Sequence, residues 1–135
     1  MQEIIDLTRK LGHAIQAGDF YKNYSAAKLS ADADESLQTM IAEFNRVRVA
    51  INSEACKKER DEEVLRSLNE QMRTLYSDIM SNERMVAYNE SKQEFDSSLQ
   101  RIVAIITQSA EGEDPDTTDY SPDCTHDCST CGGCH

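Results

Sequence analysis

The chain has 135 residues, a formal net charge of −11 at pH 7 and 39% hydrophobic residues. This length suits one domain with a modest hydrophobic core. The excess of acidic residues argues against direct binding of nucleic acid, which requires clustered Lys and Arg, and no apolar run approaches the roughly 20 residues that cross a bilayer.

Helices are expected over nearly all of residues 1–110, because this stretch contains no proline and only two glycines, Gly12 and Gly18. A first helix is predicted from about residue 2 to Ala17, with Gly18 ending it, and its apolar stripe consists of Ile4, Leu7, Leu11, Ala14 and Ile15. Asp19 is then expected to cap a second helix over about residues 20–29.

A helical hairpin is predicted in the middle of the chain. The polar residues 30–34 separate the second helix from a third at about residues 34–57, where Asp32 and Glu35 resemble a capping box. A fourth helix is expected over about residues 61–80, and both helices carry apolar residues at steps of three and four. Because only a few residues separate them, they should pack antiparallel.

A long fifth helix is predicted to start after Asn82 and to end near residue 110. Its apolar stripe is long enough to pack along the hairpin or across a subunit boundary, and consists of Met85, Tyr88, Phe95, Leu99, Ile102 and Ile106. Both prolines fall in residues 111–123, which we expect to form a flexible acidic linker. The domains predicted are thus 1–110, 111–123 and 124–135.

Residues 124–135 predict a metal site. The four cysteines, at spacings typical of metal ligands, are Cys124, Cys128, Cys131 and Cys134. Four thiolates complete the ligand set of an iron–sulfur cubane or of tetrahedral zinc, and His126 and His135 are alternative ligands. The N-terminus lacks the features of a signal peptide, so we expect a cytoplasmic protein with reduced cysteines. Cys56 lies off the apolar stripe of its helix and is expected to be a structural or exposed thiol.

Two other functions fit the cysteines. One is a zinc-binding interaction module whose metal is purely structural. The other is a dithiol oxidoreductase that uses Cys128 with Cys131 or Cys131 with Cys134, although such pairs normally sit at a helix start that lowers one thiol pKa. No catalytic triad, phosphate loop or paired-carboxylate motif is present, and we therefore expect a protein that is not an enzyme.

Residues 1–110 resemble the YlbF/YmcA family of small helical bacterial regulators. The most informative segment runs from Asn82 to Tyr88 and continues through the apolar stripe of the fifth helix. Support comes from Leu11 and Ile15, from Phe20 and Tyr24, and from residues 37–44. Family members often have proline after the asparagine, where this chain has Glu83. Both residues suit the first turn of a helix.

The resemblance implies an oligomeric, all-α cytoplasmic adaptor, with the helices in a hairpin or bundle. Such an adaptor joins paralogues and an unrelated protein in a complex associated with iron–sulfur clusters, with ribonuclease Y, and with competence, biofilm and sporulation decisions. The resemblance therefore favours an iron–sulfur cluster on the cysteines, a 4Fe–4S cubane, over zinc. The first residues to examine as a partner surface, besides the stripe of the fifth helix, are Phe20, Tyr21 and Tyr24.

Overall fold

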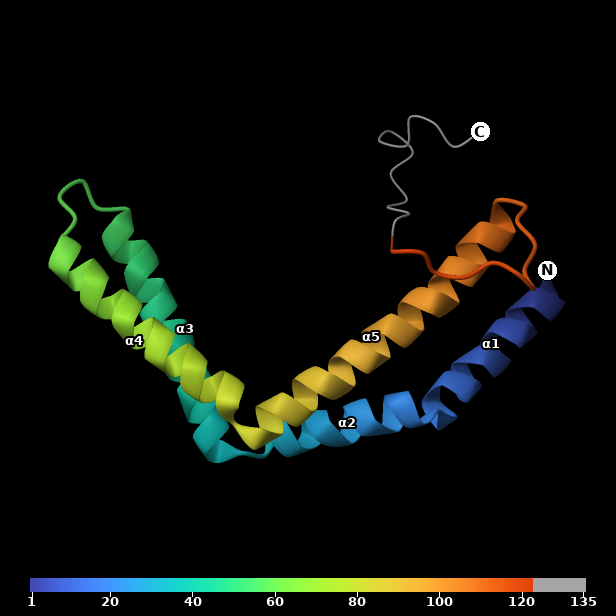
Figure 1. Ribbon diagram of the computed structural model, residues 1–135, viewed down its shortest axis with the longest axis horizontal. Coiled ribbons are helices and arrows are strands. Elements are labelled where there is room, and N and C mark those ends of the chain that lie inside the picture. The colour runs from blue at the N-terminus through green and yellow to red at the C-terminus, as the bar shows by residue number, and fades with distance from the viewer. Residues whose placement is uncertain (123–135) are drawn as a thin grey trace. The chain divides into compact units, whose positions relative to one another are not determined.

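The structure is a computed structural model that describes residues 1–122, which contain five α-helices and no β-strand (Figure 1). The helices are α1 (Gln2–Ala17), α2 (Asp19–Asp32), α3 (Glu35–Ala55), α4 (Glu62–Ser81) and α5 (Glu83–Ala110). The chain divides into two compact units, Met1–Gln93 and Glu94–His135, and the boundary falls within α5. The all-α prediction is confirmed for the described residues.

Gly18 joins α1 to α2. Its N–H donates to the Ile15 carbonyl at 3.1 Å and ends α1 where the sequence predicted. A Cβ atom at Gly18 would lie 2.6 Å from Cε1 of Phe20, so the aromatic ring occupies the space of a side chain. Asp19 was wrongly expected to be the cap of α2. Gly18 is the N-cap, without a side-chain hydrogen bond, and Asp19 lies in the first turn, where its charge favours the helix dipole.

The junction between α2 and α3 differs from the prediction. Helix α2 continues three residues beyond position 29, because Ala31 is buried in the core and a helical backbone holds it there. The prediction of a capping box that starts at Asp32 is therefore wrong. The N-cap of α3 is Asp34, whose Oδ1 accepts a hydrogen bond from the Leu37 N–H at 3.1 Å.

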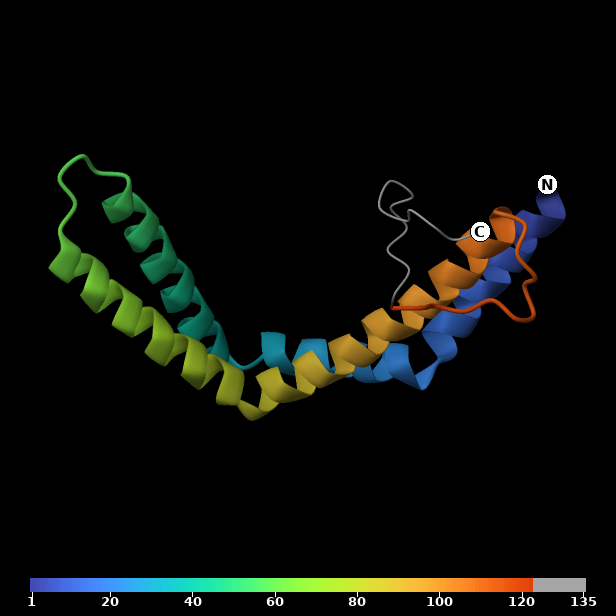
Figure 2. The same ribbon diagram turned by 45° about the horizontal axis from the view of Figure 1, so that its top comes forward.

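Helices α3 and α4 form the predicted hairpin and lie side by side in Figures 1 and 2. Val47 of α3 is fully buried, and the rings of Phe44 and Tyr76 approach to 6.3 Å between centroids. Asp61 caps α4 by accepting hydrogen bonds from the N–H groups of Glu63 and Val64. The apolar stripes on the two helices thus pack against each other.

A buried carboxylate closes the hairpin. The Glu54 side chain is 12% exposed. One of its oxygens accepts a hydrogen bond from the Asp61 N–H at 2.9 Å, and the other accepts one from Nζ of Lys57 at 2.6 Å. These hydrogen bonds, that of Lys57 foremost, lower the pKa of Glu54. The end of α3 is in this way tied to the start of α4.

The core of the first unit is small. Leu37, which is fully buried, packs with Ala31 and Ile79, and so joins residues of α2, α3 and α4. The partly buried side chains around them are Met40, Ile41, Phe44, Met85 and Tyr88. Because Met85 and Tyr88 precede Gln93, the first turns of α5 belong to this core.

Polar contacts link two helix junctions that are far apart in sequence. Asn82 caps α5, as predicted, by accepting hydrogen bonds from the N–H groups of Arg84 and Met85. Nε of Arg84 lies 3.7 Å from Oδ2 of Asp34, and its Nη1 donates to the Ser30 carbonyl at 3.3 Å. The hydrogen bond from the Leu37 N–H, more than any other contact, lowers the pKa of Asp34. The α4–α5 junction is thereby held against the α2–α3 junction.

Candidate functional site

The predicted metal ligands lie outside the described residues. These are the four cysteines at positions 124, 128, 131 and 134, together with His126 and His135. Within residues 1–122, no group of three or more His, Cys, Asp and Glu side chains is arranged to hold a metal ion. Cys56 follows the last residue of α3 and is an exposed free thiol. The metal site of the tail stays a prediction.

The predicted aromatic residues of α2 belong to the first unit. Phe20, Tyr21 and Tyr24 are each partly buried. The ring of Tyr24 lies 5.9 Å from that of Tyr88, measured between centroids. Burial, followed by the hydrogen bond with Tyr24, raises the pKa of the Tyr88 hydroxyl. Tyr88 and Met85, which were predicted to belong to a partner surface, pack against the core of the first unit. Their role in a partner surface stays a prediction.

The second half of α5, in the second unit, carries exposed apolar side chains. Phe95, Leu99 and Ile102 are partly buried, whereas Ile106 is 54% exposed. Val103, which the predicted interface omitted, is 58% exposed. Val103 follows Leu99 by four residues and precedes Ile106 by three, and this helical spacing was the signal that sequence reasoning overlooked.

Helix α1 contains no buried residue. Ile4 and Leu7 of its predicted apolar stripe are 60% and 57% exposed. Sequence reasoning found this stripe but did not include it in the predicted partner surface. A stripe of this kind without a covering partner is typical of a surface that packs on another protein.

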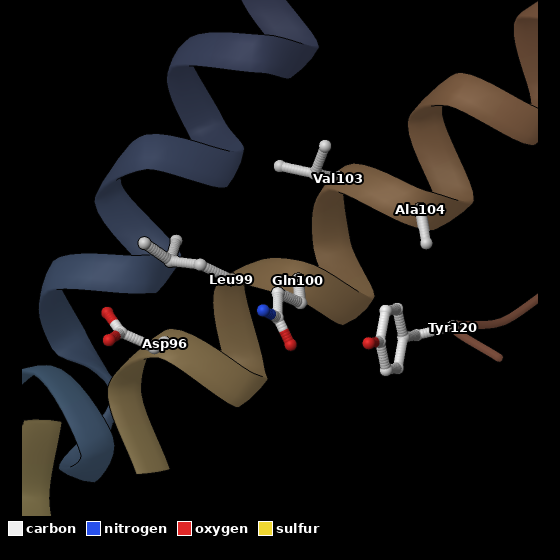
Figure 3. A pocket seen from close by; sticks show the side chains of 6 residues that line it. All are labelled: Asp96, Leu99, Gln100, Val103, Ala104 and Tyr120. Carbon is white, nitrogen blue, oxygen red and sulfur yellow. The ribbon is translucent and has the colours of Figure 1, made fainter. Parts of the chain in front are cut away.

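A hollow lies on the second half of α5, between the helix and the residue Tyr120 (Figure 3). It has a volume of about 400 Å³. The ring of Tyr120 lies beside Ala104, which is only 3% exposed, and the aliphatic side chains of Leu99 and Val103 line the same hollow. The segment after α5 therefore returns to the helix that it has just left.

Backbone hydrogen bonds hold the segment after α5 in the conformation that leads it back to the helix. Gly112 has φ +100°, a conformation that favours glycine, and its N–H donates to the Ser109 carbonyl. The Glu113 N–H donates to the Gln108 carbonyl at 3.0 Å, which completes a Schellman motif. The carbonyl of Asp114 then accepts hydrogen bonds from the N–H groups of the two threonines at positions 117 and 118.

Arg101 and Asp119 close the return. Nε and Nη2 of Arg101 donate to the two carboxylate oxygens of Asp119 at 3.0 and 2.6 Å, which is bidentate geometry. Nε2 of Gln108 donates to the Asp119 carbonyl at 3.1 Å. The sequence contains no local signal for a pair 18 residues apart, and sequence reasoning missed it. The predicted flexibility of residues 111–123 stays a prediction.

The Asp119 carboxylate should titrate far below its ordinary pKa. The hydrogen bonds from Arg101, and next that from the Tyr120 N–H, lower the pKa of Asp119 from 3.8 to about 2. The Arg101–Asp119 pair therefore contributes fully to stability above pH 3.8, and this contribution is lost as the pH falls through about 2. We expect the ¹³C shift of this carboxyl to have its midpoint near pH 2, and Arg101→Gln to return it toward 3.8. An equal midpoint in both proteins would contradict the pairing.

The comparison with protein families decides the identity of the helical part. Residues 4–110 match the family described as "Control of competence regulator ComK, YlbF/YmcA". The chain belongs to the YlbF/YmcA family. The match covers all five helices apart from the first two residues of α1, so the resemblance seen in the sequence is confirmed.

The YlbF/YmcA match ends at residue 110, before the return segment and the cysteines. The description of the family places its members among regulatory proteins. Comparisons with curated proteins and with solved structures gave no match. None of the helices described in this YlbF/YmcA protein is long and apolar enough to cross a membrane.

Proposed function

We propose that the protein is a non-enzymatic cytoplasmic adaptor that pairs with copies of itself or with paralogous YlbF/YmcA proteins and carries an iron–sulfur cluster on its C-terminal cysteines. In this proposal it acts as a subunit of a complex that modulates ribonuclease Y and developmental decisions such as competence. Membership of a family of regulators supports the regulatory part.

The observation that carries the adaptor proposal is the exposed apolar surface of α1. Ile4 and Leu7 stand on one stripe of a helix without any buried residue. At about 25 cal/mol per Å² of apolar surface, covering such a stripe stabilises a complex. Val103 and Ile106 on α5 offer a second exposed apolar surface, in the other unit of the chain.

The donor set of the tail supports a metal group. Four thiolates within eleven residues are a complete ligand set for a cubane, and iron–sulfur clusters are held by cysteine thiolates. A bound cluster would supply sensitivity to oxygen and to redox state. The seven acidic residues of the segment 111–135, which has no Lys or Arg, would make a cationic metal group favourable there.

A structural zinc site is the second candidate. The same four cysteines match the ligand number and type of tetrahedral zinc. In that case the tail would form an interaction module with no response to oxygen. The adaptor proposal for the helical domain is the same in both cases.

Anaerobic purification tests the proposal, with a visible spectrum and iron, sulfide, zinc and molar-mass measurements on one sample. We expect broad absorption near 400 nm, about four irons and four sulfides per site, and a mass above that of one chain. A colourless protein with about one zinc per four cysteines would replace the cluster by the second candidate. A metal-free protein with the 15.2 kDa mass of one chain would contradict both the metal and the self-association proposals.

A further inference from the structure

The segment between α5 and the cysteine tail makes several hydrogen bonds and an apolar contact with α5. We call residues 111–120 the strap. It leaves α5 through the Schellman motif at Gly112 and turns at Asp114. It then meets α5 again at Arg101, nine residues before the end of the helix at Ala110. Each of these contacts lies within the second unit of the chain.

We infer that the strap is a positioning device, held by Arg101, Asp119 and Tyr120, that shortens the tether between the middle of α5 and Cys124. Its importance for metal binding rests on the proposed function. The docking of the strap does not, because it depends only on residues 99–120.

Several weak contacts act together in the strap. The Arg101–Asp119 pair alone is exposed, with 65% and 44% of the two side chains accessible, and such pairs contribute little by themselves. Here the pair is bidentate and is joined by the hydrogen bond from Gln108 to the Asp119 carbonyl. The Tyr120 N–H donates to Oδ1 of Asp119 at 2.7 Å, and this orients the carboxylate toward Arg101.

An apolar contact adds to these polar ones. Tyr120, 42% exposed, places its ring beside Ala104, and the smallness of alanine leaves room for the ring on the helix surface (Figure 3). A tyrosine suits such a position, because its ring can cover apolar surface while its polar end faces water.

Covalent geometry sets the consequence for the tail. Cys124 follows Tyr120 by four residues, so an extended chain of at most about 3.6 Å per residue tethers it within about 14 Å of a docked Tyr120. If the strap were free, Cys124 would be tethered to Ala110 by 14 residues, which reach about 50 Å. The local concentration of a tethered group falls roughly as the −3/2 power of tether length, so docking raises it about sixfold at this part of α5.

Leu99 and Val103 are the apolar side chains of α5 that line the hollow beside Tyr120. The proposed adaptor uses the same face of α5 for its partners. On the proposed function, a docked strap would therefore limit how far a metal group on the tail can lie from this partner surface. A tail on a free linker would have the longer tether of 14 residues from Ala110.

A spin label on Cys124 tests the placement without metal. In the full-length chain with the other four cysteines replaced by serine, a nitroxide on Cys124 should broaden the methyl resonances of Val103, an exposed residue of the same unit. We expect Asp119→Asn to reduce the broadening at Val103 at least about twofold, with about sixfold as the limit for a detached strap.

Asp116→Asn is the matched control. It removes the same charge from the same strap, at a side chain that takes no part in the Arg101 contacts, and should leave the broadening unchanged. Equal broadening at Val103 in all three proteins would overturn the inference. Circular dichroism should show the same helix content throughout, since both aspartates lie outside the helices.

Proteolysis gives a second measurement on the protein with all its cysteines. A glutamate-specific protease should cut after Glu113 several-fold faster in Asp119→Asn than in the parent or in Asp116→Asn, as mass spectrometry of the fragments would show. Equal rates would count against the strap. A protein that binds no metal yet shows both effects would refute the proposed cofactor and leave the strap standing.

Discussion

Replacing Leu37 by alanine is expected to lower the free energy of unfolding by about 3 kcal/mol, within the usual range for a buried leucine. Leu37 is fully buried and packs with Ala31 and Ile79, so the substitution leaves a cavity where three helices meet. The core of the first unit is small, and few other contacts can compensate. Urea unfolding followed by circular dichroism, at one protein concentration, measures the change.

Leu29→Ala is the matched control. Leu29 belongs to α2 and is 69% exposed, so the same chemical change should alter the free energy of unfolding by no more than about 0.5 kcal/mol. If the two variants lost equal stability, the core would not be centred on Leu37. If Leu29→Ala lost more, the exposed face of α2 would be covered by another chain in solution.

The double variant Cys128→Ser with Cys131→Ser should lose the bound metal group completely. Two of the four thiolates are removed, and neither a cubane nor a four-cysteine zinc site keeps its ligand set. We expect absorption near 400 nm to disappear and iron, sulfide and zinc to fall to background. The helix content should stay unchanged, because all five helices end at or before Ala110.

Cys56→Ser is the control for this variant. Cys56 is an exposed thiol just beyond α3, and its loss should leave the metal content as it was. Metal retained in the double variant would show that the tail cysteines are not the ligands. Partner affinity that is identical with and without the metal group would refute a regulatory role for it.

Much of the helical part could be predicted because its signals are local. The absence of proline, the apolar steps of three and four, and the cap at Asn82 predicted α1, α4 and the start of α5 to within a residue. The error at the α2–α3 junction has a physical cause. Asp32 and Asp34 are equally good caps in sequence, and only the burial of Ala31 selects the second.

The candidate site was less predictable because its contacts are distant in sequence. The bidentate pair joins Arg101 to Asp119 across a helix end and a turn, and no periodic pattern in the sequence predicts such a pair. Exposure of the α1 stripe likewise depends on what the other helices leave uncovered. The metal-binding prediction rests on ligand spacing alone, and it concerns residues beyond position 122.

The α3–α4 hairpin also bears on how the chain folds as it is synthesised. Its two helices are joined by six residues and clasped by Glu54, so closing this loop costs little conformational entropy. The contacts of Leu37 with Ile79 and Met85 span more than forty residues and close later. During translation the hairpin can therefore form first, and its apolar base stays open until the first turns of α5 leave the ribosome.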